Sequence, residues 1–400
     1  MISFFFLFVY SFSFCSFKKK ELSQIESKYS IDLDGKHESS ILLSSYFKAP
    51  KTIILETNND CLIGHINKLQ SFDGYIFILD KSIAKSLLIF DRNGRFIRKI
   101  GRLGQGPGEY VQLDDFTLDT ENGFIFLLDY GERLHKYRFD GTFIQTITPK
   151  VQNANINFIQ CYNKRLYLSV LPYKPTLDDF MLMETDLYDG KILAKSLPYK
   201  YNKGWTTPIF MGHSFFVSRL NGPPLYVQMF MDFIVSVGEN SIPYIELKSR
   251  NLVTERDIRN ISNTNGGAKA IYNNLSSYFQ ESLKIFDVHS YIENDEIILF
   301  NYQQGFTNVN TVIFHKKTRS VELSKYIKRD LIFQNNDNRF FGGFAFSDSD
   351  GAYEILITLA IERFQESIRN NEVVPELDRL DDLLKLEDDA NPVIFYYEFK

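Results

Sequence analysis

A pattern of about fifty residues occurs twice in succession in the first third of the chain, and a fixed period of this kind restricts the possible folds. Each copy has an apolar strand after a turn, followed by two strands around a tight turn: Asp73–Asp80 (DGYIFILD) and Leu88–Ile100, then Asn122–Asp129 (NGFIFLLD) and Lys136–Ile147. Asp80 and Asp129 lie 49 residues apart, and Gly94 and Gly141, in Asn-Gly and Asp-Gly turns, lie 47 apart. Such turns favour β-hairpins. The pattern therefore predicts blades of a β-propeller.

Fainter copies of the pattern continue toward the C-terminus. They are Arg165–Val170 with Phe180–Leu193, Ser214–Ser218 with Phe233–Leu247, Glu296–Asn301 with Asn310–Leu323, and Tyr353–Thr358 with Val393–Phe399. Residues of about 254–286 and 359–389 instead show helical spacing of apolar side chains. The rest of the chain fits an all-β, six-bladed propeller over residues 49–400 with two short helical insertions. The strand-like run Lys51–Thr57 is expected to join the sixth blade, so that no blade keeps an unpaired edge.

A glycine-rich run lies between the two clear copies and allows two interpretations. It contains Gly101, Gly104, Gly106, Pro107 and Gly108. A phosphate-binding loop would need a Lys-Ser or Lys-Thr pair opening a helix, whereas a strand is expected at this point, and Glu109 would repel a phosphate. We therefore interpret the run as the structural connector between blades one and two, and we expect Gly106→Val to destabilise the fold.

The N-terminus has the features of an export signal. An apolar run of thirteen residues, Ile2–Phe14, precedes Cys15, as in a lipoprotein leader. No basic residue precedes the run, and Phe14 stands where a small residue is expected before a lipidated cysteine. We predict a leader over residues 1–17 with lipidation at Cys15, and a polar spacer arm over residues 18–48 between this anchor and the folded domain.

Several of these segments resemble one known family. The run from Ile53 (IILETNNDCLIGHINKL), through FILD and IFDRNGRFIRKIGRLGQGPGEY to DDFTLD, is similar to the six-bladed β-propeller lipoproteins of Bacteroidetes. Asn391–Pro392 followed by VIFYYEFK resembles the C-terminal strand of that family. The resemblance covers about residues 41–400 and implies an NHL/TolB-like propeller exported to the cell envelope. It implies no catalytic residues.

Composition and scattered polar residues exclude several classes of site. A net charge of −5 argues against a nucleic-acid partner. Only His65 and His289, of six histidines, fit innermost strands, and they belong to non-neighbouring blades, so no metal site is expected. Cys61 and Cys161 are expected to be buried and unpaired, and Asp348–Gly351 is expected to be a polar turn rather than a calcium site.

Two functions from different classes follow from this fold. We expect a non-enzymatic envelope propeller, periplasmic or at the outer membrane, lipid-anchored or secreted, that binds a peptide, protein or glycan ligand on an axial face. We expect a monomer without a cofactor that contacts the membrane only through the N-terminal anchor. The alternative is a propeller-fold enzyme, such as a glycan lyase or hydrolase, which would need clustered titratable groups with shifted pKa values at the channel mouth.

Overall fold

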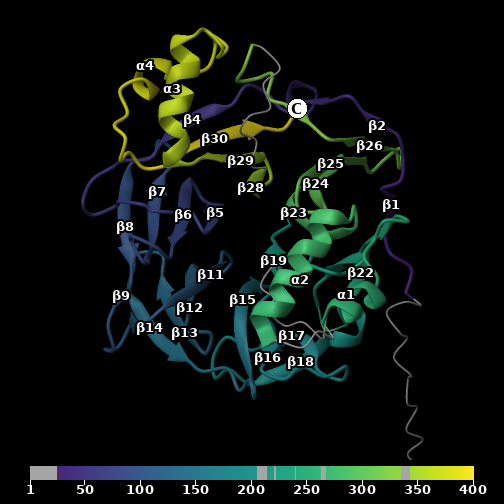
Figure 1. Cartoon of the computed structure of the whole chain (residues 1–400). Coiled ribbons are helices and arrows are strands. Elements are labelled where there is room, and N and C mark those ends of the chain that lie inside the picture. Colours follow the sequence, from purple (N-terminus) through teal and green to yellow (C-terminus); the bar gives the residue numbers. More distant parts are fainter. Residues whose placement is uncertain (1–24, 205–213, 220–221, 239, 263–266, 335–342) are drawn as a thin grey trace, which may run out of the picture.

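A computed structural model describes residues 25–400 except 205–213, 220–221, 239, 263–266 and 335–342. Six antiparallel sheets stand around a common axis, and Figure 1 looks along this axis. The expected all-β, six-bladed propeller is therefore confirmed. Cys15 and His213 lie outside the described residues.

Each blade has four antiparallel strands, which follow one another from the axis to the rim. Blade one contains, in this order, β5 (Lys68–Phe72), β6 (Tyr75–Asp80), β7 (Ser86–Asp91) and β8 (Phe96–Ile100). Blade two contains β11 (Leu113–Asp119), β12 (Phe124–Asp129), β13 (Arg133–Arg138) and β14 (Phe143–Ile147). Blade three contains β15 (Ala154–Tyr162), β16 (Arg165–Pro172), β17 (Phe180–Thr185) and β18 (Ile192–Pro198).

The second half of the ring follows the same order. Blade four contains β19 (Ser214–Val217), β20 (Leu225–Gln228), β21 (Phe233–Ser236) and β22 (Ile242–Lys248). Blade five contains β23 (Ile285–Glu293), β24 (Ile297–Gln304), β25 (Asn308–His315) and β26 (Val321–Ser324). Blade six contains β28 (Phe344–Ser347), β29 (Gly351–Leu356), β30 (Val393–Glu398) and β4 (Lys51–Ile54).

The sixth blade closes the ring with strands from both ends of the chain. Strand β4 pairs antiparallel with β30, and Ile53 lies opposite Ile394. This pairing confirms the expected role of the N-terminal strand. Because β4 supplies the outermost strand of the last blade, the two ends of the propeller cannot separate without breaking a blade.

The hydrophobic core consists of layers between neighbouring blades. Phe77 and Leu79 of blade one pack in one buried cluster with Phe116 and Leu127 of blade two. A further cluster joins blades two and three in the same way. Strands β6 and β12 are buried along almost their whole length because each lies inside a sheet that is covered on both faces. This explains why the apolar residues of FILD and LLD follow one another without polar residues at every second position.

The stretch expected to be a spacer is in fact part of the propeller from Tyr29 onward. Strand β1 (Tyr29–Asp32) pairs parallel with β22 as a fifth strand of blade four, and β2 (His37–Glu38) does the same on β26. Strand β3 (Ile41–Leu42) pairs with β27 (Ile327–Lys328). The expectation of a solvated arm was wrong for this stretch, since Tyr29 and Ile31 are buried against the outer strand of blade four.

The helical insertions occupy one face of the propeller. The first forms α1 (Glu255–Ser262) and α2 (Gly267–Glu281) between blades four and five, and we call this pair the helical arm. The second forms η5 (Thr358–Ala360), α3 (Ile361–Arg369) and α4 (Leu380–Leu383) between β29 and β30. Short 3₁₀ turns also occur, η2 (Leu43–Ser45) and η3 (Tyr199–Tyr201). Within the described residues, no helix has the length and apolarity needed to cross a membrane.

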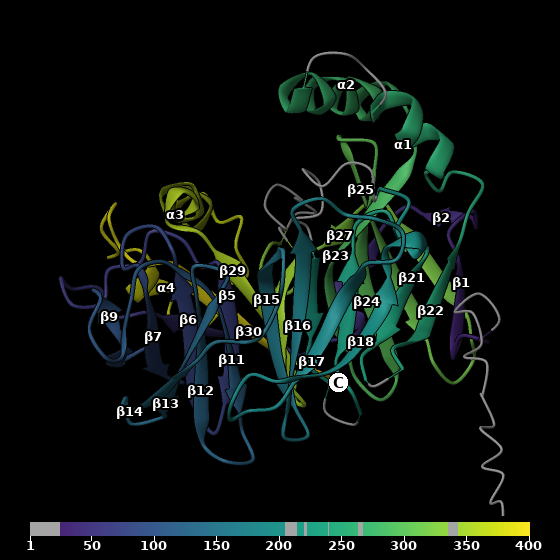
Figure 2. The same ribbon diagram turned by 90° about the horizontal axis from the view of Figure 1, so that it is seen from below.

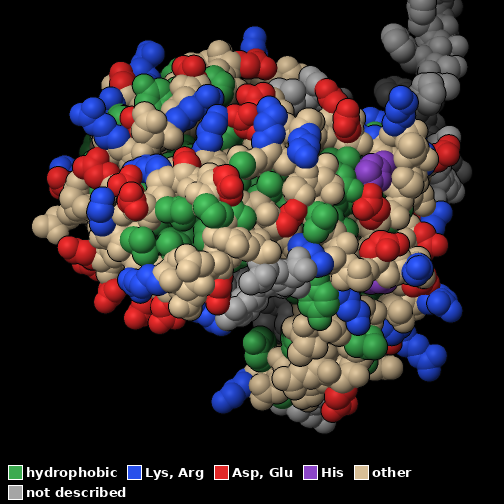
Figure 3. Space-filling view, turned by 90° about the horizontal axis from the view of Figure 1, so that it is seen from above, with side chains coloured by type: hydrophobic (Ala, Val, Ile, Leu, Met, Phe, Trp, Pro, Cys, Tyr) green, Lys and Arg blue, Asp and Glu red, His purple; other side chains and the backbone are tan. Residues whose placement is uncertain are grey.

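Both insertions lie on the same face because of how the strands are connected. Loops from the second to the third strand of a blade, and from the outermost strand to the next blade, all lie on this face, which we call the entrance face. The remaining hairpins form the far face. Figure 2 shows α1, α2 and α3 along the entrance face, and Figure 3 shows the helical arm as a lobe separated by a hollow from the propeller body.

Candidate ligand-binding site

An axial pocket of about 270 Å³ lies in the centre of the ring. The innermost strands of all six blades contribute to it. Its lining includes Asn67, Lys68, Gln70, Lys81, Asp114, Asp115, Phe158, Phe215, Ser218, His289, Ser290, Tyr291, Phe346 and Ser347. The pocket exists because the innermost strands of a propeller converge on the axis without filling it.

An ion pair between Lys68 and Asp115 forms part of the wall of the axial pocket. The Lys68 ammonium lies 2.8 and 3.0 Å from the two carboxylate oxygens of Asp115, and it also donates to the carbonyl of Phe116 at 2.7 Å. Asp115 in turn accepts the backbone N–H of Ile159 at 2.8 Å. Side chains from β5 and β11 thus join blades one, two and three beside the axis.

On the opposite side of the pocket, His289 and Ser290 lie at an irregular part of β23. The pairing of β23 with β24 shifts between His289 and Ile292, and Ser290 has a positive φ of 54°. Gly343, with a φ of +91°, approaches so closely that a Cβ there would stand 2.1 Å from the Ser290 hydroxyl. A glycine is therefore required where blades five and six meet at the pocket.

The acidic group Asp287 lies on the same strand, two residues before His289. Burial raises the pKa of its carboxyl to about 7, although a hydrogen bond from the backbone N–H of Val288 opposes this shift. This is the one strongly shifted acid on the described part of an innermost strand. Asp80, by contrast, is buried but receives several hydrogen bonds that keep the pKa of its carboxyl below the usual value.

A larger groove of about 750 Å³ lies beside the axial pocket, between blades two and three, and we call it the side groove. The two spaces share Lys81, Asp114 and Phe158 in their linings. The rest of the groove is formed by the loop after β12, the start of β15 and the end of β16. Pocket and groove are therefore neighbouring spaces with part of their walls in common, and we call the two together the recess.

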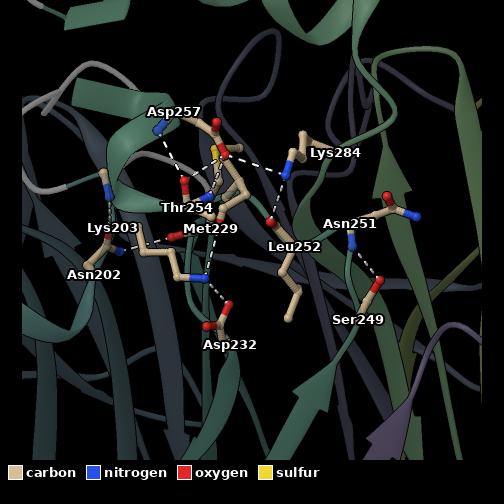
Figure 4. Close-up of polar contacts among 12 residues, drawn as sticks. Asn202, Lys203, Met229, Asp232, Ser249, Asn251, Leu252, Thr254, Asp257 and Lys284 are labelled. Carbon is tan, nitrogen blue, oxygen red and sulfur yellow. Dashed lines mark hydrogen bonds and ion pairs between the residues drawn. The ribbon is translucent and has the colours of Figure 1, made fainter. Parts of the chain in front are cut away.

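The helical arm is fixed to the propeller at its base, as Figure 4 shows. Lys203 pairs with Asp232 and donates to the carbonyl of Val253 at 2.7 Å, directly before the arm begins. Thr254 and Asp257 exchange hydrogen bonds that cap α1, and Lys284 lies 3.6 Å from the Asp257 carboxylate. The base of the arm is thus held by charges from blades four and five.

One face of the arm packs its apolar side chains on the propeller. Phe279 of α2 lies in a buried cluster with Phe230 and Phe286, and its ring centroid is 4.1 Å from that of Phe286. Residues 285–286, expected within the insertion, already belong to β23. The second insertion likewise buries Phe364 and Leu383 against blade six.

The glycine-rich run lies between β8 and β11, at the boundary of blades one and two. It pairs β9 (Arg102–Leu103) with β10 (Glu109–Tyr110). The Glu109 carboxylate accepts the backbone N–H of Gly106 at 2.8 Å and pairs with Arg102 at 2.6 Å. The N–H that a phosphate would need is thus bound by the chain's own acid.

The glycines of this run differ in how strictly they are needed. Gly101, Gly104 and Gly108 have positive φ angles, and a Cβ at Gly108 would lie 2.7–3.0 Å from Phe143. Gly106 has no such backbone conformation, and a Cβ there would meet only the end of Glu109. We therefore expect a substitution at Gly108, rather than at Gly106, to destabilise the fold.

The remaining expected residues lie apart from one another. His65 precedes β5 rather than lying on it, whereas His289 is on β23. No group of three metal-ligating side chains occurs among the described residues. Cys61 and Cys161 are buried and free, as expected. Asp348 accepts backbone N–H groups of Asp350 and Gly351 at 3.0 Å, which is the geometry of a polar turn.

Comparisons with known proteins describe the family and the fold. A family model described as "Domain of unknown function (DUF4934)" matches residues 28–398. No curated protein matches the chain. The structure is similar to that of a "Putative exported protein" from Bacteroides fragilis NCTC 9343, with 20% identity, a TM-score of 0.70, and coverage of 93% of this chain and 99% of that one. It is also similar to a DUF4221 family member from Bacteroides vulgatus ATCC 8482, with 12% identity, a TM-score of 0.52, and coverage of 88% and 98%.

Proposed function

The chain belongs to the DUF4934 family, and on this premise we propose that it is an exported, non-enzymatic propeller that binds a ligand in the recess of its entrance face. The observation that supports this most directly is that the axial pocket and the larger side groove lie side by side on this face and share three lining residues. A concave site lined by apolar walls and a few polar groups is the usual form of a ligand site.

The entrance face also exposes many large apolar side chains. In the loops of this face they include Ile83, Leu103, Val111, Tyr130, Tyr173, Leu177, Leu283, Phe306, Ile357 and Leu359. Leu359 is 92% exposed. Far-face turns contribute fewer, among them Tyr75 and Tyr188. Exposed apolar groups that gather around a recess are typical of interaction surfaces.

The bonding of Asp115 favours binding over catalysis. A glycan hydrolase needs carboxylates that are available to the sugar on both sides of the scissile bond. Both oxygens of Asp115 instead accept hydrogen bonds from Lys68, and one also binds the Ile159 N–H. The proposal therefore gives this acid a structural role between blades.

Export to the cell envelope is part of the proposal, together with an NHL/TolB-like repeat and lipidation at Cys15. The exported protein from Bacteroides fragilis with the same fold supports export, as does the leader-like N-terminus. Metabolic labelling with a fatty acid, followed by cell fractionation, tests the anchor. We expect label in the envelope fraction that Cys15→Ser removes; an unlabelled parent protein in the cytoplasm would contradict this part.

Ligand capture tests the proposed face. The full mature chain, immobilised, is incubated with envelope extract, and bound protein and glycan are identified by mass spectrometry. Lys81 lines both parts of the recess, so Lys81→Glu should remove the ligand, whereas the exposed far-face Lys317→Glu should not. Equal capture by both variants would exclude the entrance face. Release of shortened sugars from a polysaccharide would instead support the lyase or hydrolase.

A further inference from the structure

We infer that the side groove between blades two and three is a carbohydrate subsite that binds a neutral oligosaccharide. This inference rests on the proposed function, because the groove is part of the recess described above. Of the three expected ligand classes, namely peptide, protein and glycan, it selects the glycan. The following contacts support this choice.

Two tyrosines present exposed rings at the groove. Tyr130 is 58% exposed and Tyr173 is 60% exposed. The backbone of each tyrosine is held in place, since the Tyr130 N–H donates to the Gln112 carbonyl at 2.8 Å and the Tyr173 N–H to the Asn153 carbonyl at 2.9 Å. The Tyr173 hydroxyl also donates to Asn155 Oδ1 at 3.1 Å, which orients the ring.

Exposed aromatic rings are suited to stacking against the C–H face of a sugar ring. A tyrosine side chain has few rotatable bonds, and the Tyr173 ring is already oriented by its hydroxyl, so little side-chain entropy is lost on binding. Phe158 continues the apolar wall toward the axial pocket, so the groove offers contacts along the path of an extended chain.

Planar polar side chains lie in the same groove. Gln112, Asn155 and Asn157 carry carboxamides, and Asp114 and Glu132 carry carboxylates. Gln112 Nε2 donates to Asp114 Oδ1 at 2.8 Å, which sets the orientation of both groups. Each planar group offers two hydrogen-bonding atoms about as far apart as neighbouring hydroxyls on a sugar, and carboxamides both donate and accept.

The charge of the groove selects among carbohydrates. Two carboxylates and one ammonium group, that of Lys81, line it, so a polyanionic chain of uronic acids or sulfated sugars would be repelled at close range. A proline-rich peptide would also use the aromatic rings, but it has few groups to match five planar polar side chains. A neutral, polyhydroxylated ligand satisfies both sets of contacts.

Binding of neutral oligosaccharides to the full mature chain tests the inference, first on a glycan array and then by calorimetry with the oligosaccharides that bind. Tyr130→Ala and Tyr173→Ala should each weaken binding about tenfold, because each removes a stacking surface. Tyr173→Phe keeps the ring and should stay within about threefold of the parent. Circular dichroism confirms that each variant is folded.

Blade three provides a matched control. Tyr188 is also an exposed tyrosine of this blade, 78% accessible, but it lies in a far-face turn, so Tyr188→Ala should bind like the parent. No binding to any neutral oligosaccharide, together with a captured peptide or protein that Lys81→Glu releases, would overturn the carbohydrate inference and leave the proposed function intact. Oligosaccharide binding that is unchanged in both tyrosine variants would also overturn it. If Lys81→Glu captured ligand as well as Lys317→Glu does, binding would not depend on the entrance face, and the proposed function itself would be rejected.

Discussion

Asp80 and Asp129 occupy equivalent positions at the ends of β6 and β12, and each carboxylate holds the segment that leads into the innermost strand of its own blade. Asp80 accepts the backbone N–H of Gly64 at 2.8 Å, and Asp129 accepts those of Val111 and Gln112 at 3.0 and 2.9 Å. The repeated aspartate therefore has a physical purpose, which is to bond backbone groups that the strands leave free.

Removing this carboxylate should destabilise the propeller. Asp129 is fully buried and also pairs with Arg133 and with the buried His135, so Asp129→Ala removes the acceptor of two backbone N–H groups and leaves His135 Nε2 without this partner. We expect a loss of about 3 kcal/mol in the free energy of unfolding, measured by urea denaturation. The exposed Glu121→Ala should change it by less than about 0.5 kcal/mol. An equally small effect of Asp129→Ala would contradict this role.

The connector between blades one and two should respond differently at two of its glycines. Gly108→Ala places a methyl group against Phe143 at a positive φ, and we expect a loss of about 2 kcal/mol. Gly106→Ala should cost less than about 0.5 kcal/mol, since only the end of the Glu109 side chain must shift by a few tenths of an ångström. Thermal melts of both variants check this order; a more damaging Gly106→Ala would reverse the assignment.

The stability of the fold should depend on pH through Asp287. Because burial raises the pKa of this carboxyl to about 7 in the folded chain, whereas it is about 3.9 in an unfolded one, the folded state binds more protons between these values. Its contribution to stability therefore decreases as pH rises from about 4 to 7. Asp287→Asn should remove this decrease of stability with pH. At about pH 8 the variant should therefore unfold at a higher temperature than the parent. Parallel stability curves for parent and variant would contradict the prediction.

The helical arm should loosen when its aromatic contact is removed. Phe279→Ala leaves a cavity beside Phe230 and Phe286, with an expected loss of about 3 kcal/mol. Hydrogen exchange should quicken first in the amides of α2, because the arm is attached at one side of the ring. Asn273→Ala, at an exposed position of the same helix, is the control. Uniformly faster exchange in all blades would show that the arm does not open by itself.

The sequence predicted the ring but not the lining of its pocket. Gly94 and Gly141 mark tight hairpins, and the apolar second strands are recognisable because they are buried on both faces. The innermost strand of blade one was expected around His65, whereas β5 begins at Lys68, because the polar Lys68 and Gln70 interrupt the apolar pattern and the partner of Lys68 lies in blade two. Lys68 and Asp115 lie 47 residues apart, and only the closed ring brings them together.

The N-terminal strand β1 was missed for a different reason. Its four residues stand in a polar stretch, and their alternation of buried and exposed side chains is too short to be distinguished from chance. Its stability comes from pairing with β22, which is more than two hundred residues away in the chain. Contacts of this kind have no local signal in the sequence.

The direction of β1 decides how the protein can be tethered. It runs parallel to β22, which ends at the entrance face, so β1 begins toward the far face, where Lys28 lies beside Tyr244 and Glu293. A membrane anchor upstream of Tyr29 would therefore be attached on the side of the far face. The far face would then be turned toward the membrane, and the recess on the entrance face would be turned away from it.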